Sequence, residues 1–389
     1  MSDCGLLLLD GTWKIARDPD NVGRAESWFA AQRPEAIDVP VPGIIQQVFP
    51  NYHGVVWYWR SFQGDLPSDA IHRVLLHLQN VDYLGEFWLN GQSVGRHEGS
   101  ETPFDLDVTA AYLPGVENHL CVRVVNVGAT PIDGLVLADV PHRNRADPYT
   151  NGSSQNLGGI VWSVELRRVP TVRIIDVFAQ PDIHSGSFSV SVSLRNEANC
   201  VVAGSLDWSI GSAAAESASV EASYRRLFTA DPGDSVYEAK LTLPQPRLWE
   251  LDNPFLYRLT VTAATHPANM PYASPMQHSY SVRCGLRELR VERGFFRLNG
   301  KRIFMRSTHT CNHYPISQRV PPLPDLLRRD LLHVKEAGMN CVRYISGVSN
   351  PGQLDFCDEL GLLVYEECQA SWCLGDSPRA EQLYEQATS

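Results

Sequence analysis

Residues 325–365 have the sequence DLLRRDLLHVKEAGMNCVRYISGVSNPGQLDFCDELGLLVY, in which the spacing of the apolar residues changes along the chain. Over residues 325–337 the apolar side chains recur largely at three- and four-residue steps, which predicts an amphipathic helix. Gly338 suits the position just past the end of that helix, where a positive φ is favoured. Residues 340–345 and 362–365 are short apolar runs that predict strands on either side of a second, shorter helix. Strands and helices that alternate at this spacing indicate a parallel β/α architecture.

The first 290 residues have a different pattern, made of short strands broken by turn signals. The alternation over residues 56–60 is typical of a half-buried strand. Asn90-Gly91 lies between two such runs and favours a type I′ hairpin, because both residues tolerate positive φ. This first region predicts a β-sandwich of jelly-roll type. Residues 171–285 add about seven short strands, the size of an immunoglobulin-like sandwich.

The composition sets limits on partners and location. A chain of 389 residues with 43% hydrophobic residues is expected to form two or three globular domains. Its net charge of −11 argues against a nucleic-acid partner. No run approaches the roughly 20 apolar residues that cross a bilayer, and Leu6 to Leu9 lack the basic segment of a signal peptide. The nine cysteines form no CxxC pair, so we expect free thiols and a cytoplasmic protein.

Several short motifs follow one another along the whole chain. They are Trp88-Leu89-Asn90-Gly91, Pro103-Phe104-Asp105, Gly158-Gly159-Ile160, Leu248-Trp249, Asn253-Pro254, Gly285-Leu286-Arg287-Glu288, Phe296-Arg297-Leu298-Asn299-Gly300-Lys301, Val342-Arg343 and Asp358-Glu359. In this order they resemble the N-terminal two-thirds of glycoside hydrolase family 2, the family of β-galactosidases, β-glucuronidases and β-mannosidases.

The resemblance implies a mainly β chain of three domains. Residues 1–170 would form a sugar-binding jelly-roll sandwich, and residues 171–288 an immunoglobulin-like sandwich. Residues 289–389 would form the start of a (β/α)8 barrel with about three strands. A complete barrel needs about 250 residues, so we expect the barrel to be truncated.

The implied function is hydrolysis of the O-glycosidic bonds of β-glycosides. Retaining glycosidases use two carboxyl groups about 5–5.5 Å apart, one as acid/base and one as nucleophile. The resemblance places them after barrel strands 4 and 7. We therefore expect both beyond Ser389, with no catalytic residue in this chain and no activity of the chain alone. A non-catalytic carbohydrate-binding protein and an inactive fragment are the alternatives. We interpret Asn196-Glu197, in the second domain, as a surface turn rather than a catalytic pair.

Residues that follow the barrel strands are the candidates for substrate binding, because the loops there build the active site of this fold. The resemblance implies that Arg343 braces the site through charge-assisted hydrogen bonds, and a structural salt bridge is the alternative. Glu367 would line the sugar pocket, or be a solvated or paired acid beside Glu366. Trp372 would stack on a sugar ring or pack in a core.

After the first barrel strand the chain continues with residues 309–313, His-Thr-Cys-Asn-His. His309 and His313 would contact the sugar or pack in the loop. A metal site is disfavoured because no second cluster of ligands is visible, and we expect neither metal nor cofactor. Residues 344–347 differ from the His-Tyr-Pro sequence of many family members, so the sugar and its linkage stay open. Assembly of a longer chain into a homo-oligomer also stays open.

Overall fold

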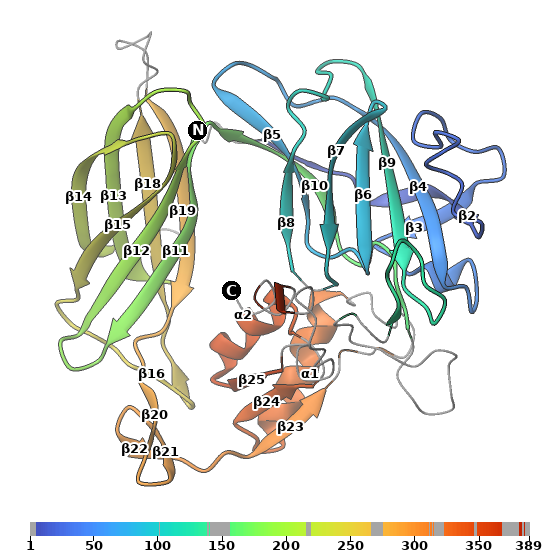
Figure 1. Cartoon of the computed structure of the whole chain (residues 1–389). Coiled ribbons are helices and arrows are strands. Elements are labelled where there is room, and N and C mark those ends of the chain that lie inside the picture. The colour runs from blue at the N-terminus through green and yellow to red at the C-terminus, as the bar shows by residue number, and fades with distance from the viewer. Residues whose placement is uncertain are drawn as a thin grey trace.

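The computed structural model describes residues 5–100, 102–137, 140, 156–214, 219–265, 275–310, 312, 314, 323–345, 348–367, 381–382 and 385. Two β-sandwiches lie on either side of a small unit of parallel strands and helices, drawn in orange and red in Figure 1. The mainly β architecture predicted from the sequence is confirmed.

The first sandwich consists of two antiparallel sheets that enclose an apolar core. The smaller sheet contains, in spatial order, β1 (Gly5–Leu8), β10 (Val164–Pro170), β5 (His72–Leu78) and β8 (Phe104–Asp107). The larger contains β3 (Ile37–Val41), β2 (Gly11–Asp18), β4 (Gly54–Gln63), β9 (Glu117–Asn126), β6 (Leu84–Leu89) and β7 (Gln92–Glu98). One 3-10 turn, η1 (Ile45–Gln47), follows β3. Asn90 and Gly91 join β6 to β7 with φ of 53° and 78°, which confirms the predicted type I′ hairpin.

Strand β4 is buried on both faces, so the prediction of a half-buried strand is wrong. Trp57 is 0% exposed and Trp59 only 7%. Residues 19–36 cover this outer face, where the indole of Trp59 donates to the carbonyl of Trp28 at 3.0 Å. The alternating pattern fits either case, because tryptophan can face solvent or a second apolar layer.

The second sandwich has seven main strands, the number predicted for an immunoglobulin-like unit. One sheet contains β11 (Val172–Asp182), β12 (Ser187–Asn196) and β15 (Gly233–Thr242). The other contains β14 (Val220–Ala230), β13 (Val202–Ser212), β18 (Tyr257–Thr265) and β19 (Met276–Cys284). A two-residue ladder of β16 (Trp249–Glu250) with β17 (Asn253–Pro254) lies at the end nearest the helices.

The interpretation of Asn196-Glu197 as a surface turn is wrong in detail. Asn196 ends β12, is 2% exposed, and donates to the carbonyls of Cys200 and Ala230 at 3.0 Å each. Glu197 forms an ion pair with Arg173 at 2.7 Å. Both side chains hold the sandwich together.

The third region contains the predicted parallel strands. It begins with an antiparallel sheet of β20 (Leu289–Glu292), β21 (Phe295–Leu298) and β22 (Lys301–Arg302). A parallel sheet follows, with β23 (Ser307–Thr310), β24 (Cys341–Tyr344) and β25 (Leu363–Glu366) in that order. Helices α1 (Pro324–Glu336) and α2 (Pro351–Leu360) pack on one face of it. Neither described helix is long and apolar enough to cross a membrane. Within the described residues the parallel sheet has three strands and does not close into a barrel.

The β16–β17 segment joins the second sandwich to this parallel sheet. Trp249 is 0% exposed, packs with Cys341 and Leu363, and its indole donates to the carbonyl of Asp358 in α2 at 2.8 Å. The carbonyl of Leu251 accepts a hydrogen bond from Lys335 of α1 at 2.5 Å.

The same carbonyl of Leu251 explains the glycine at position 361. Gly361 ends α2 with φ of 70°, a conformation that other residues adopt at a cost. A Cβ atom there would collide with the Leu251 carbonyl oxygen. The sandwich therefore contacts the helix end without a gap.

We expect Trp249→Ala to destabilise the helical unit by about 3–5 kcal/mol, because it removes a large buried side chain and leaves a cavity. The loss is measured as a lower urea midpoint of the helical circular dichroism signal, since both main helices lie in this unit. Phe304→Ala is the control, because Phe304 is 79% exposed. Equal midpoints for the two variants would show that Trp249 does not join the two parts.

Candidate functional site

The carboxyl ends of the three parallel strands form the candidate site. The strand register places His309, Arg343 and Tyr365 next to one another across the sheet. Because side chains alternate along a strand, this row lies on the face opposite Val342 and Tyr344, which pack against the helices. His309 is exposed and Tyr365 is 57% exposed. Within the described residues the row forms a polar and aromatic face of the sheet.

Arg343 and Glu367, two of the predicted substrate-binding residues, form an ion pair. Arg343 Nε donates to Glu367 Oε1 at 2.7 Å, and Nη2 donates to the same oxygen. The Glu367 side chain is only 13% exposed, whereas that of Arg343 is 42% exposed. The guanidinium also lies 5.5 Å from the centre of the Tyr365 ring. The pair fixes one side of the guanidinium while the other remains accessible.

The neighbouring acid, Glu366, has a structural role on the opposite face of the sheet. It accepts hydrogen bonds from the backbone N–H of Ser349 at 3.0 Å and from the Ser349 hydroxyl. These bonds hold residues 348–350, which lead into α2. The carboxylates of Glu366 and Glu367 are thus both engaged, and they lie on opposite faces of the sheet.

Asn312 and Gln353 form a buried amide pair that the sequence analysis missed. Each amide nitrogen donates to the other residue's oxygen at 3.0 Å, and the two residues are 7% and 5% exposed. The hydroxyl of Tyr314 adds a bond to Asn312 Oδ1 at 3.2 Å. The pair joins the segment after β23 to the start of α2.

One sequence signal pointed to Gln353. Asn350 followed by Pro351, with Gln353 three residues after the asparagine, is the pattern of a capping box. Gln353 Oε1 accepts from the Asn350 N–H at 2.9 Å, and Asn350 Oδ1 accepts from the Gly352 N–H at 2.9 Å. The pattern fixes the helix start, but not the contact with Asn312.

Tyr344 and Cys357 lie behind the site, between the sheet and α2. Tyr344 is 0% exposed, and its hydroxyl lies 3.9 Å from Cys357 Sγ. Burial raises the pKa of the Cys357 thiol to about 12 and holds the Tyr344 pKa well above its usual range. Both groups stay protonated near neutral pH and serve packing.

The remaining predicted residues differ in outcome. His309 lies beside Arg343, but its ring makes no hydrogen bond to the residues that the structure describes. His313 and Trp372 lie outside the described residues. Among the residues that are described, no group of three His, Cys, Asp or Glu side chains could hold a metal ion.

Comparison with known families assigns each part of the chain. Residues 43–170 match the sugar binding domain of Glycosyl hydrolases family 2, residues 172–271 match Glycosyl hydrolases family 2, and residues 289–386 match the TIM barrel domain of that family. The chain belongs to glycosyl hydrolase family 2. The resemblance seen in the sequence motifs is confirmed.

Several relatives match over most of the chain. A β-glucuronidase of Rattus norvegicus is 25% identical over 406 residues, covering 93% of this chain and 56% of the relative. A β-galactosidase of Aeromonas hydrophila is 26% identical over 396 residues, covering 92% of this chain and 36% of the relative. A β-glucuronidase of Paenibacillus borealis is 26% identical over 320 residues, covering 77% and 48%. The chain spans about half the length, or less, of these curated relatives.

Solved structures show the same fold. The β-glucuronidase from Ruminococcus gnavus in complex with N1-substituted uronic isofagomine has a TM-score of 0.80 and 20% sequence identity. The match covers 99% of this chain and 64% of that chain. At this identity the similarity concerns the fold alone.

We expect Gln353→Leu to lower the stability of the helical unit by about 1–3 kcal/mol, because the buried Asn312 amide loses its partner. Gln353→Glu is the matched comparison, since a carboxylate still accepts from Asn350 and Asn312. Its urea midpoint, followed by helical circular dichroism, should lie between those of Gln353→Leu and the natural protein. A Leu variant as stable as the natural protein would contradict the assigned amide pair.

Proposed function

We propose that the protein to which this chain belongs hydrolyses O-glycosidic bonds of β-glycosides by a retaining mechanism with two carboxyl groups. Its family and its relatives, named as β-glucuronidases and β-galactosidases, support this proposal. The observation that carries it is the Arg343–Glu367 pair, at the end of parallel strands where this fold places its active sites.

Arg343 is proposed as the residue that orients substrate or a catalytic carboxylate. Glu367 holds one side of its guanidinium, so the remaining N–H groups keep a fixed direction with little loss of side-chain entropy. His309, next to it on β23, is proposed as a sugar contact. His313 and Trp372 remain proposed contacts of the same sugar.

We propose that the acid/base and the nucleophile lie beyond Ser389. The two carboxylates at the described strand ends support this, because one is paired with Arg343 and the other with Ser349. A complete barrel of this fold needs about 250 residues. On this proposal residues 1–389 do not hydrolyse glycosides alone. The proposed domain boundary at residue 170 separates the two sandwiches, and the boundary at residue 288 separates the second sandwich from the barrel strands.

The pairing of Glu367 with Arg343 and of Glu366 with Ser349 also favours one other function, carbohydrate binding without hydrolysis. In that case Arg343, His309 and Tyr365 would hold a sugar that is released unchanged. Binding of a glycoside by the whole gene product, with no release of its aglycone, would distinguish this function from the first.

The chain is also proposed to work in the cytoplasm without a nucleic-acid partner. Five described cysteines, Cys121, Cys200, Cys284, Cys341 and Cys357, are free thiols, as a reducing compartment favours. A net charge of −11 disfavours phosphate backbones.

The gene product, read to its stop codon, is the protein to assay against 4-nitrophenyl β-D-glucuronide and β-D-galactoside. We expect Arg343→Met to lower kcat/KM by about 10²-fold or more, as removal of an oriented active-site donor does. Arg195→Met is the matched control, because Arg195 also forms a two-bond pair, with Asp234 on the second sandwich.

Two results would contradict this assignment. Equal loss of activity in both arginine variants would show that Arg343 acts only through stability. Turnover by pure protein of residues 1–389 would show that the carboxyl groups are within this chain.

A further inference from the structure

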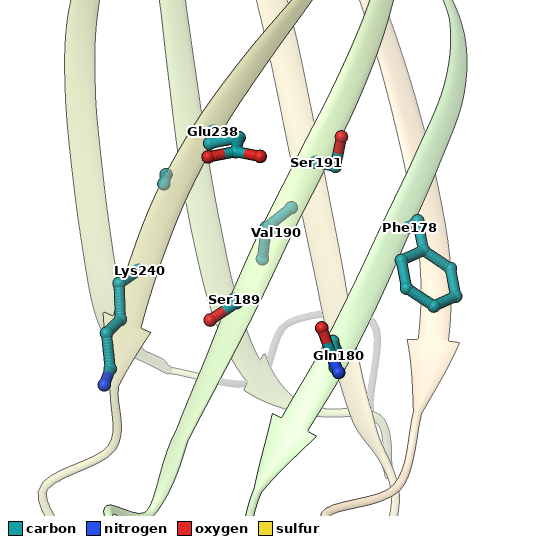
Figure 2. A pocket seen from close by; sticks show the side chains of 8 residues that line it. Phe178, Gln180, Ser189, Val190, Ser191, Glu238 and Lys240 are labelled. Carbon is teal, nitrogen blue, oxygen red and sulfur yellow. The ribbon is translucent and has the colours of Figure 1, made fainter.

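The outer face of the sheet β11–β12–β15 contains a groove away from the strand ends of the candidate site. Figure 2 shows the residues that line it, on β11, β12 and β15. Ser189 and Ser191 of β12 form the floor, and the groove has a volume of about 320 Å³. Phe178 and Gln180 of β11 form one wall, and Glu238 and Lys240 of β15 form the other.

The groove follows from the sizes of the residues in register across the sheet. Ser191 lies between Phe178 and Glu238, and Ser189 lies between Gln180 and Lys240. A small side chain in the central strand between two long ones leaves a trough that runs along β12. The alternate residue, Val190, points to the core and is 1% exposed.

The polar groups of the groove make little contact with the rest of the protein, although the charge of Lys240 acts on Asp182 and helps to lower the pKa of that carboxyl. Among the described residues, the side chains of Gln180, Ser189, Ser191, Glu238 and Lys240 make no hydrogen bond and no ion pair. The same two strands do form such a pair elsewhere, since Arg195 and Asp234 are opposite in register and bond at 2.8 Å. In the groove each charge is opposite a serine instead.

The lining indicates the chemistry of the ligand. The Phe178 ring is 61% exposed on an edge strand, and an aromatic face suits the apolar C–H groups of a sugar ring. Glu238 accepts hydrogen bonds, Lys240 donates them, and the serines and Gln180 do both. One negative and one positive charge cancel, so the groove favours a neutral polyhydroxyl chain over a polyanion or a polycation.

An extended peptide fits this floor less well. The backbone of β12 is already paired with β11 on one side and with β15 on the other, so it offers no strand edge. A ligand in the groove meets side chains alone. Contact with side chains alone suits the hydroxyl groups of a sugar, because each hydroxyl can form its own hydrogen bond with one side chain.

We propose that this groove binds a neutral oligosaccharide lying along β12, at a site separate from the row of His309, Arg343 and Tyr365. The Phe178 ring stacks on one sugar unit, and Gln180, Glu238 and Lys240 bond to hydroxyl groups of the units beside it. The site does not depend on hydrolysis at the barrel strands.

The test uses residues 1–389 and isothermal titration calorimetry with cellohexaose, xylohexaose and mannohexaose. At least one of them is expected to bind, and Phe178→Ala is expected to weaken that binding about tenfold, as the loss of one aromatic contact does. Ser191→Leu, which fills the floor, should abolish it. Phe304→Ala is the matched control with an exposed phenylalanine outside this sandwich, and should bind as the natural chain does.

A further variant separates this proposal from the function proposed above. Arg343→Met should leave hexasaccharide binding unchanged, whereas a loss would place the sugar at the barrel strands and overturn the groove assignment. Absence of binding to all three hexasaccharides would also overturn it. Tighter binding of hexagalacturonate than of the neutral sugars would contradict the neutral ligand, and circular dichroism checks that each variant is folded.

Discussion

The burial of Trp249 is the constraint on which the arrangement of this chain depends. Its indole belongs to the second sandwich, yet it packs under the parallel sheet and bonds to α2. Cys341 and Leu363, which Trp249 contacts, are the first residues of β24 and β25. The second sandwich therefore supports the amino ends of these strands, opposite the ends that carry Arg343 and Glu367. Gly361 completes this contact, because a larger residue would push the helix away from Leu251.

Much of the fold could be predicted from local pattern. The helix that begins at Pro324 follows from three- and four-residue spacing, and the Asn90-Gly91 hairpin follows from turn chemistry. The second covered face of β4 could not be predicted in this way. The segment that covers it, residues 19–36, has no periodicity, and its position depends on contacts such as that of Trp28 with Trp59.

In the candidate site, too, some features follow from local sequence pattern and others depend on tertiary contacts. Arg343 and Glu367 could be proposed as site residues because the end of a parallel strand is a position that the sequence pattern can locate. Asn312 and Gln353 were missed as a pair, because they are 41 positions apart and meet only when the segment after β23 reaches α2. Local rules are sufficient to place the cap at Asn350, whereas only the tertiary structure shows the second partner of Gln353.

The β16–β17 segment also determines how two ligand sites would act together. A sandwich attached to the sheet by a buried indole, by Lys335 and by two ion pairs of Arg283 cannot swing as a domain on a linker does. A saccharide held on the outer face of that sandwich would remain at a constant distance from the strand ends. The free end of the saccharide would reach a high effective concentration at the strand ends only if the saccharide is long enough to span that distance. The length of the saccharide would then become a basis for selectivity.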